Sequence, residues 1–133
     1  MRISAFVQSG GGALEARVAT GGSMQELPVP AKPDGHGSAV NGGEFLMLAL
    51  ATCYCNDLYR EAQRVGIALT RVEVETHAEF AGVGLAARDI RYRTRVESSA
   101  SPEQIGELIR HTDAVAEIHN TVRTGVPVTL EPT

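Results

Sequence analysis

The sequence predicts an α+β domain in which antiparallel sheet packs around one long central helix. Short strand-like segments fill the first 30 residues, an apolar helical run extends from Glu44 to about Val65, and two alternating segments with shorter helices follow. Strands and helices grouped in blocks are typical of an α+β fold and not of alternating βαβ units. With 43% hydrophobic content, the 133 residues suffice for one core, so we expect a single domain over residues 1–133.

The first 30 residues read as three short strands joined by glycine-rich turns. We expect these strands at 3–8, 13–20 and 24–29, forming a meander. Three prolines between residues 28 and 33 end the pairing, because proline cannot donate to a strand ladder. A glycine-rich loop over 32–43 then leads into the long helix.

The central helix is predicted over residues 44–65. It is apolar nearly all round in its first half and amphipathic in its second half, and Gly66 provides a stop signal. A helix with this pattern is expected to lie in the middle of a core.

Two alternating strands follow the central helix. The first is predicted to point Val72, Val74, Thr76, Ala78 and Phe80 inward. The second is predicted to point Ile90, Tyr92, Thr94 and Val96 inward. The outward face of the first is mainly acidic and that of the second mainly basic, so the two strands are expected to pair.

The C-terminal third is predicted to hold two short helices and a closing strand. Ser101 to Gln104 forms a capping box with proline at the first helical position. The buried stripe of that helix is Ile105, Leu108 and Ile109. Asp113 is expected to cap a further short helix, and 125–130 is expected to form an edge strand.

Composition excludes several classes of function. The net charge is -4 and the basic residues form no run, so nucleic acid is not an expected partner. No segment approaches the roughly 18 apolar residues that span a bilayer, so we expect no membrane association and a cytoplasmic location. The two cysteines and four histidines lack metal-ligand spacing, and we expect neither a metal nor a cofactor.

Thiol chemistry is the first hypothesis, because the central helix carries both cysteines. Cys53 lies where the apolar stripe turns polar, whereas Cys55 points about 200° away, so the two cannot form a disulfide without local unwinding. A reactive thiolate needs a nearby positive charge. Arg60 is only marginally close enough to Cys53, and the negative charge of Asp57 disfavours a thiolate. We therefore favour Arg17 as the cation. Alternatively, a buried cysteine is simply a small core residue.

The histidines are not predicted as site residues. His36 lies in a glycine-rich loop and is expected in a solvated turn, and His77 lies on the polar face of its strand. His111 and His119 are expected in surface or capping roles on the short helices.

The sequence from Asn41 to Cys53 resembles the start of the central helix in the OsmC/Ohr family. The order of the other elements, the Ser-Pro-Glu-Gln helix and the final His-Asn-Thr-Val…Gly-Val-Pro-Val segment extend the resemblance over nearly the whole chain. It implies an intertwined α+β homodimer and thiol-dependent reduction of organic hydroperoxides. The working parts of such proteins are a peroxidatic cysteine, a resolving cysteine, an arginine and a glutamate.

Carried over residue by residue, the resemblance places the peroxidatic cysteine at Cys53 and the arginine at Arg17. The resolving cysteine falls on Ala116 and is absent. The glutamate falls on Gly43, and this chain has Glu44 instead, nine residues before Cys53. Nine positions turn a helical side chain about 180° from the cysteine, so Glu44 takes the catalytic part only if the helix start is irregular. Otherwise it stabilises the helix N-terminus.

These departures leave three hypotheses for the function. The first is a hydroperoxide reductase with one working cysteine, restored by an external thiol. The second is a module that binds a small apolar ligand or senses oxidants without turnover. The third is a structural or interaction protein, since fold does not fix function.

Overall fold

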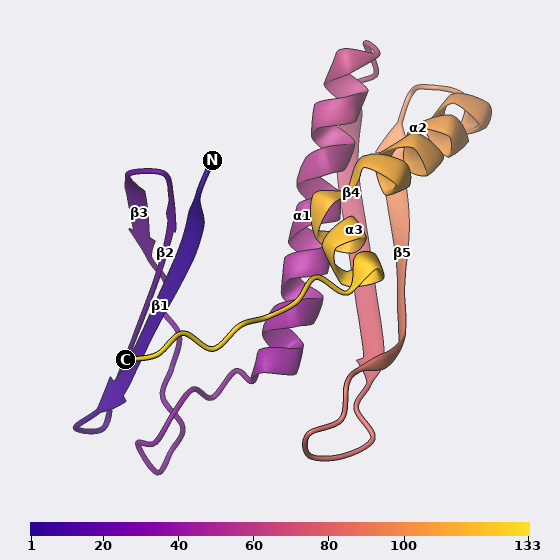
Figure 1. The fold of residues 1–133 in the computed structure, drawn as a ribbon. Helices are drawn as coiled ribbons and strands as arrows, with labels where there is room; N and C mark the ends of the chain where they lie inside the picture. Colours follow the sequence, from indigo (N-terminus) through magenta and orange to yellow (C-terminus); the bar gives the residue numbers. More distant parts are fainter. The chain divides into compact units, whose positions relative to one another are not determined.

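Five strands and three helices make up the computed structural model, which describes residues 1–133 (Figure 1). The chain divides into two units, Met1–Phe45 and Leu46–Thr133, and each is described by itself. All strand pairs are antiparallel, which confirms the predicted α+β class. None of the helices has the length and apolar character needed to cross a membrane.

The first unit contains a three-stranded sheet in the order β1-β2-β3. Its strands are β1 (Ile3–Gly10), β2 (Ala13–Thr20) and β3 (Ser23–Glu26). The turn between β1 and β2 uses Gly11 and Gly12, both with positive φ, as a tight two-residue hairpin requires. The predicted meander is confirmed, although β3 ends at Glu26, earlier than expected, just before the proline-rich stretch.

The long helix α1 (Gly42–Arg64) begins two residues earlier than predicted because Asn41 caps it. The Asn41 N–H donates to the Glu44 carboxylate and the Glu44 N–H donates to the Asn41 side chain, both at 2.8 Å. This reciprocal pair satisfies two free amides of the first turn. At the other end, Gly66 adopts the left-handed conformation with φ 74°, as the predicted stop requires.

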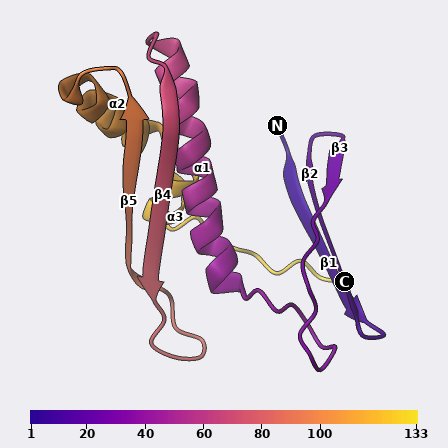
Figure 2. The same cartoon turned by 180° about the vertical axis from the view of Figure 1, so that it is seen from behind.

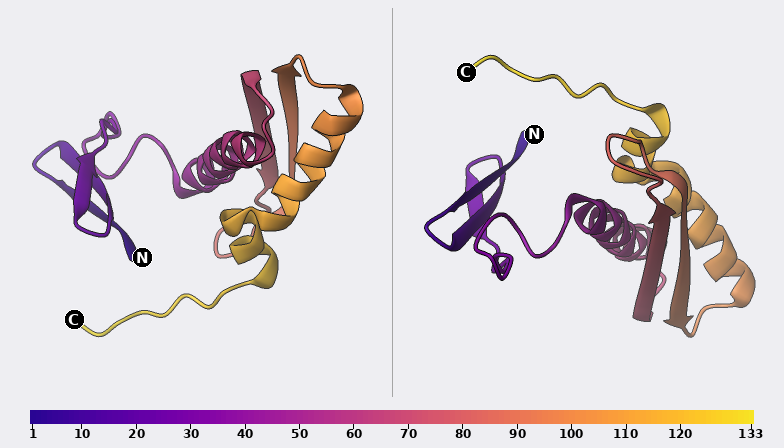
Figure 3. Two further views of the ribbon diagram at one scale, coloured as in Figure 1. Left: turned by 90° about the horizontal axis from the view of Figure 1, so that it is seen from above. Right: turned by 90° about the horizontal axis from the view of Figure 1, so that it is seen from below.

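A hairpin of β4 (Leu69–Glu79) and β5 (Arg88–Ser98) forms the sheet of the second unit. The hairpin runs beside α1 (Figures 2 and 3). Its half-buried residues alternate with exposed ones, and several of its half-buried apolar side chains pack against the buried cluster. This buried core consists of Tyr54, Leu58, Ala62, Leu108 and Ala116. The sequence prediction for this sheet is therefore confirmed, with one exception. Phe80 follows β4 and is 52% exposed, so its predicted inward position is wrong.

The predicted charge pairing across the hairpin is confirmed. Arg93 on β5 donates to Glu75 on β4 at 2.6 Å, and Arg88 pairs with Glu79 at 3.1 Å. These pairs are exposed, so each contributes only about 0–1 kcal/mol, and their main effect is to favour this register.

Helix α2 (Pro102–Val115) starts with the predicted capping box, and α3 (Glu117–Thr124) follows directly. The prediction that Asp113 caps the second helix is wrong, because α2 continues past it and Ala116 stands at the junction. Asp113 instead accepts hydrogen bonds from Arg123 and Tyr92. Its carboxylate therefore joins α3 to β5.

The predicted C-terminal strand is wrong within this chain. Residues 125–133 form no regular secondary structure, and the alternating apolar side chains Val128 and Leu130 are 99% and 96% exposed. A strand needs a neighbour for its backbone N–H and C=O groups, and no segment of the chain pairs with these residues.

Candidate functional site

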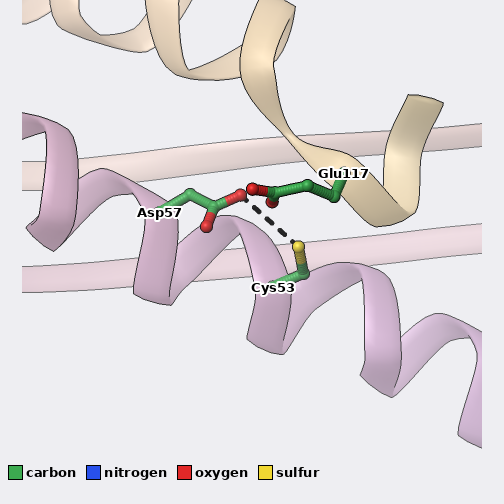
Figure 4. Close-up of side chains that lie close together, drawn as sticks. All are labelled: Cys53, Asp57 and Glu117. Carbon is green, nitrogen blue, oxygen red and sulfur yellow. Dashed lines mark hydrogen bonds between the residues drawn. The ribbon is translucent and has the colours of Figure 1, made fainter. Parts of the chain in front are cut away.

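Cys53, Asp57 and Glu117 form a thiol–carboxylate cluster in the second unit (Figure 4). Cys53 and Asp57 lie one turn apart on α1, so they share a face, and Glu117 approaches from the first turn of α3. The Cys53 thiol donates a hydrogen bond to Asp57 Oδ2 at 3.4 Å. One ligand atom of each of the three residues lies within 4.8 Å of the others. The fold thus gathers a sulfur and two carboxylates from distant parts of the sequence.

The cluster disfavours negative charge on the sulfur. Burial raises the pKa of the Cys53 thiol, and the nearby Asp57 and Glu117 carboxylates raise it further, while a backbone hydrogen bond from Ile118 lowers it. Asp57 is only 4% exposed, and burial raises the pKa of its carboxyl, with Glu117 adding to the effect. In this arrangement the thiol is protonated at neutral pH. The expectation that Asp57 works against ionisation of the thiol is confirmed.

Arg60 binds the carboxylates of the cluster. One of its guanidinium nitrogens, Nη1, donates to Asp57 Oδ1 at 2.7 Å and to Glu117 at 3.4 Å, and Nε donates to Glu61 at 3.0 Å. Its positive charge is therefore shared among three carboxylates. The prediction that Arg60 is poorly placed to activate Cys53 agrees with these contacts.

The cluster also offers the donor types that bind metals. A thiolate and two carboxylates could supply three ligands to a zinc-like ion. Sequence spacing did not indicate this set, because Glu117 lies 64 positions after Cys53. Arg60 already binds an oxygen of each carboxylate, so we assign no metal to this cluster.

The second cysteine of α1 takes no part in this cluster. Cys53 and Cys55 are both free thiols and both half-buried. Both lie within the regular helix α1, as the expectation that no disulfide joins them requires.

Arg17 and Glu44 make their contacts within the first unit. Arg17 on β2 pairs with Glu15 at 2.9 Å, and its guanidinium lies 4.3 Å from the centre of the Phe6 ring. Glu44 caps the start of α1 through Asn41, which is the stabilising role given above as the alternative to catalysis. A part for either residue in thiol chemistry stays a prediction.

His119 departs most from the sequence prediction. Instead of lying at the surface, it is 4% exposed, and its ring lies 4.6 Å from Tyr92 and 5.5 Å from Tyr54, measured between centroids. Neither ring nitrogen has a hydrogen-bond partner. Burial lowers the pKa of this imidazole, and Arg123 lowers it further, so the ring is neutral at neutral pH. His119 precedes the half-buried Val122 by three residues, about one turn of α3, and this spacing was the signal for a position on the buried face of the helix.

Glu117 is the member of the cluster that sequence reasoning missed. It follows Ala116, the position where the resemblance places a resolving cysteine, and Ala116 is fully buried. The adjacent position could have drawn attention to Glu117. Its proximity to Cys53 depends on the packing of α3, which no local pattern reveals.

The fold and the cluster define a class of protein: an α+β protein with a thiol–carboxylate site on its central helix. The chain belongs to the family of OsmC-like proteins, whose sequence pattern matches residues 35–131. The resemblance stated from the sequence is thereby confirmed. The comparison with curated proteins found no match.

Solved structures of the same fold support this assignment. An OsmC-like protein from Mycoplasma pneumoniae superposes with a TM-score of 0.68 at 17% identity, covering 92% of this chain and 88% of its own. An organic hydroperoxide resistance protein from Elizabethkingia anophelis gives a TM-score of 0.62 at 18% identity, with coverages of 92% and 89%. The organic hydroperoxide resistance protein OsmC from Legionella pneumophila gives 0.60 at 16% identity, with coverages of 92% and 90%. These likenesses show a shared fold.

Proposed function

We propose that this protein reduces organic hydroperoxides with Cys53 as its only peroxidatic cysteine, and that an external thiol restores it. The observation that carries the proposal is that a chain of the OsmC-like family holds Cys53 half-buried on its central helix, in direct contact with a proton acceptor. The names of two similar structures, both organic hydroperoxide resistance proteins, support the substrate class.

The reaction balances with one cysteine. The Cys53 sulfur attacks the terminal oxygen of the hydroperoxide, the O–O bond breaks, and a sulfenic acid and an alcohol result. An external thiol then displaces water from the sulfenic acid to give a mixed disulfide. A second thiol releases Cys53 by thiol–disulfide exchange. External thiols are required because Ala116, at the junction of α2 and α3, stands where the resemblance places a resolving cysteine.

Arg17 is proposed as the cation that offsets the negative charge around Cys53 and orients the peroxide. A positive charge near a cysteine lowers its pKa, and Arg60, the arginine at the cluster, is already bound to the carboxylates of Asp57 and Glu117. We expect Arg17→Ala to lower the rate of hydroperoxide consumption by about tenfold or more. Arg2→Ala, which changes an arginine of the same unit just before β1, is expected to retain the rate. Equal rates in both variants would remove Arg17 from the site.

A homodimer is proposed as the working form. Strand β1 is exposed along its whole length, and the C-terminal segment presents Val126, Val128 and Leu130 to solvent. Exposed strands and apolar side chains of this kind are covered by a partner in stable proteins. A second copy of this chain is the partner that the family resemblance implies.

The experiment is the consumption of cumene hydroperoxide with dithiothreitol, and then with a dihydrolipoyl system, as reductant. Wild type is expected to turn over, Cys53→Ser is expected to be inactive, and Cys55→Ser is expected to retain activity because Cys55 is not in the cluster. Turnover that survives in Cys53→Ser would contradict the proposal.

A second candidate is a module that binds a small ligand without turnover. It is favoured by the raised pKa of Cys53, since a protonated thiol is a poor nucleophile. The expected results are no peroxide consumption with either reductant and alkylation of Cys53 no faster than that of an ordinary thiol.

A further inference from the structure

We infer that Asp57 is the proton acceptor of Cys53: its Oδ2 takes the thiol proton as the sulfur attacks the hydroperoxide and then returns it to the departing alkoxide. The inference rests on the proposed function and deepens it by assigning a catalytic residue on α1. Asp57 qualifies because it contacts the reacting sulfur directly.

The two oxygens of Asp57 have different partners. Oδ2 accepts the hydrogen bond from the Cys53 thiol at 3.4 Å, and Oδ1 accepts from Arg60 at 2.7 Å. The Arg60 contact fixes the carboxylate so that its other oxygen faces the sulfur. Because the acceptor already holds the thiol hydrogen bond, no rearrangement is needed before proton transfer.

The surroundings of Asp57 make its carboxylate a stronger base. A carboxylate in water is too weak a base to take a proton from a thiol readily. Burial raises the pKa of the Asp57 carboxyl and Glu117 raises it further, whereas Cys53 and Arg60 oppose the change. His119 of α3 is also near enough to interact electrostatically with Asp57, but burial lowers the pKa of its imidazole and keeps the ring neutral. The proton affinity of Asp57 is thus moved closer to that of the thiol.

The proton balance explains why an acceptor helps. Attack by the thiol releases one proton, and cleavage of the O–O bond leaves an alkoxide, which is a strong base. Transfer from Sγ to Oδ2 and then to the alkoxide oxygen yields sulfenic acid and neutral alcohol, with no net proton change. Asp57 ends the step as it began, as a carboxylate held by Arg60.

The same contact has an opposite interpretation. A carboxylate that only stabilises the S–H group would keep Cys53 protonated and slow it. The two interpretations predict opposite effects of removing the charge of Asp57, so one variant separates them.

The experiment measures sulfenic acid formation in a single turnover with cumene hydroperoxide, trapped with dimedone, for wild type, Asp57→Asn and Glu61→Gln. Glu61 is the matched control, because it is also buried, lies on α1 and binds Arg60, yet it does not belong to the cluster. Asp57→Asn is expected to be slower than wild type by at least about tenfold at pH 7, and Glu61→Gln is expected within about twofold. Circular dichroism verifies that each variant is folded.

A measurement on wild type alone tests the inference even if the Asp57→Asn variant fails to fold. If Asp57 takes the proton, the reaction rate persists at pH values below those at which thiolate absorbance appears. If rate and thiolate absorbance rise together, the free thiolate is the reactant and the inference is overturned.

The outcomes also separate the inference from the proposed function. A wild type that forms no sulfenic acid contradicts both. A wild type that reacts, with Asp57→Asn equal or faster, contradicts only the role of Asp57.

Discussion

At the scale of single residues, Cys53 lies in surroundings that do not by themselves activate it. Its hydrogen-bond partner is an acid and the nearby cation is engaged by carboxylates, so ionisation must be assisted from elsewhere or coupled to the attack. The sequence predicted the position of Cys53 and the opposing effect of Asp57, because both follow from helical spacing. It did not predict Glu117, whose contact depends on how α3 packs.

The raised pKa of the Cys53 thiol predicts that the stability of the protein changes with pH. Its pKa in the folded state is raised, so the unfolded chain loses the thiol proton first as pH rises. The stability contributed by the protonated thiol is present below the ordinary thiol pKa and is lost as pH rises through the raised pKa. Urea titrations should show the free energy of unfolding falling more steeply above about pH 8.5 in wild type than in Cys53→Ser. Parallel curves would show that the thiol is not perturbed.

The lowered pKa of His119 predicts that stability falls as the solution becomes acidic. Its pKa is lowered by burial, so the unfolded chain takes up a proton first as pH falls below about 6.5. Stability is present above that pH and is lost below it. His119→Phe retains a ring between the two tyrosines and has no group to protonate. The variant should therefore lose less stability between pH 7 and pH 5 than wild type, as measured by thermal unfolding.

At the scale of elements, the helices and the β4–β5 hairpin could be predicted because their signals are local. Alternation of apolar and charged residues gave the strands, and the capping box gave the start of α2. The predictions for Asp113 and the final strand were wrong for a shared reason. Asp113 is engaged by Arg123 and Tyr92, and a strand at 125–130 needs a partner strand, so both depend on tertiary neighbours that the local sequence does not specify.

The start of α1 provides a test of Glu44 at this scale. If Glu44 serves only as the cap, Asn41→Ala should reduce the free energy of unfolding by about 1 kcal/mol and Glu44→Gln should destabilise less, because glutamine can still accept from Asn41. Neither should change peroxide consumption. A large loss of activity in a stable Glu44→Gln variant would restore the catalytic role that the family resemblance implies.

At the scale of the whole molecule, the exposed β1 strand and C-terminal segment predict that the protein is stable only as a homodimer. Sedimentation should give twice the chain mass, and dilution should unfold the protein along with dissociating it. Val128→Lys with Leu130→Lys should weaken association, because both side chains are almost fully exposed in the single chain. A folded monomer that persists at high dilution would contradict the dimer.

Cys53 is proposed as the residue whose sulfur accepts an oxygen atom from a hydroperoxide. The most direct measurement is the intact mass of the reduced protein after one equivalent of cumene hydroperoxide, with peptide mapping of the modified site. We expect addition of a single oxygen atom at Cys53, reversed by dithiothreitol, with Cys55 unmodified. An unchanged mass, or oxidation confined to Cys55 or the methionines, would contradict it.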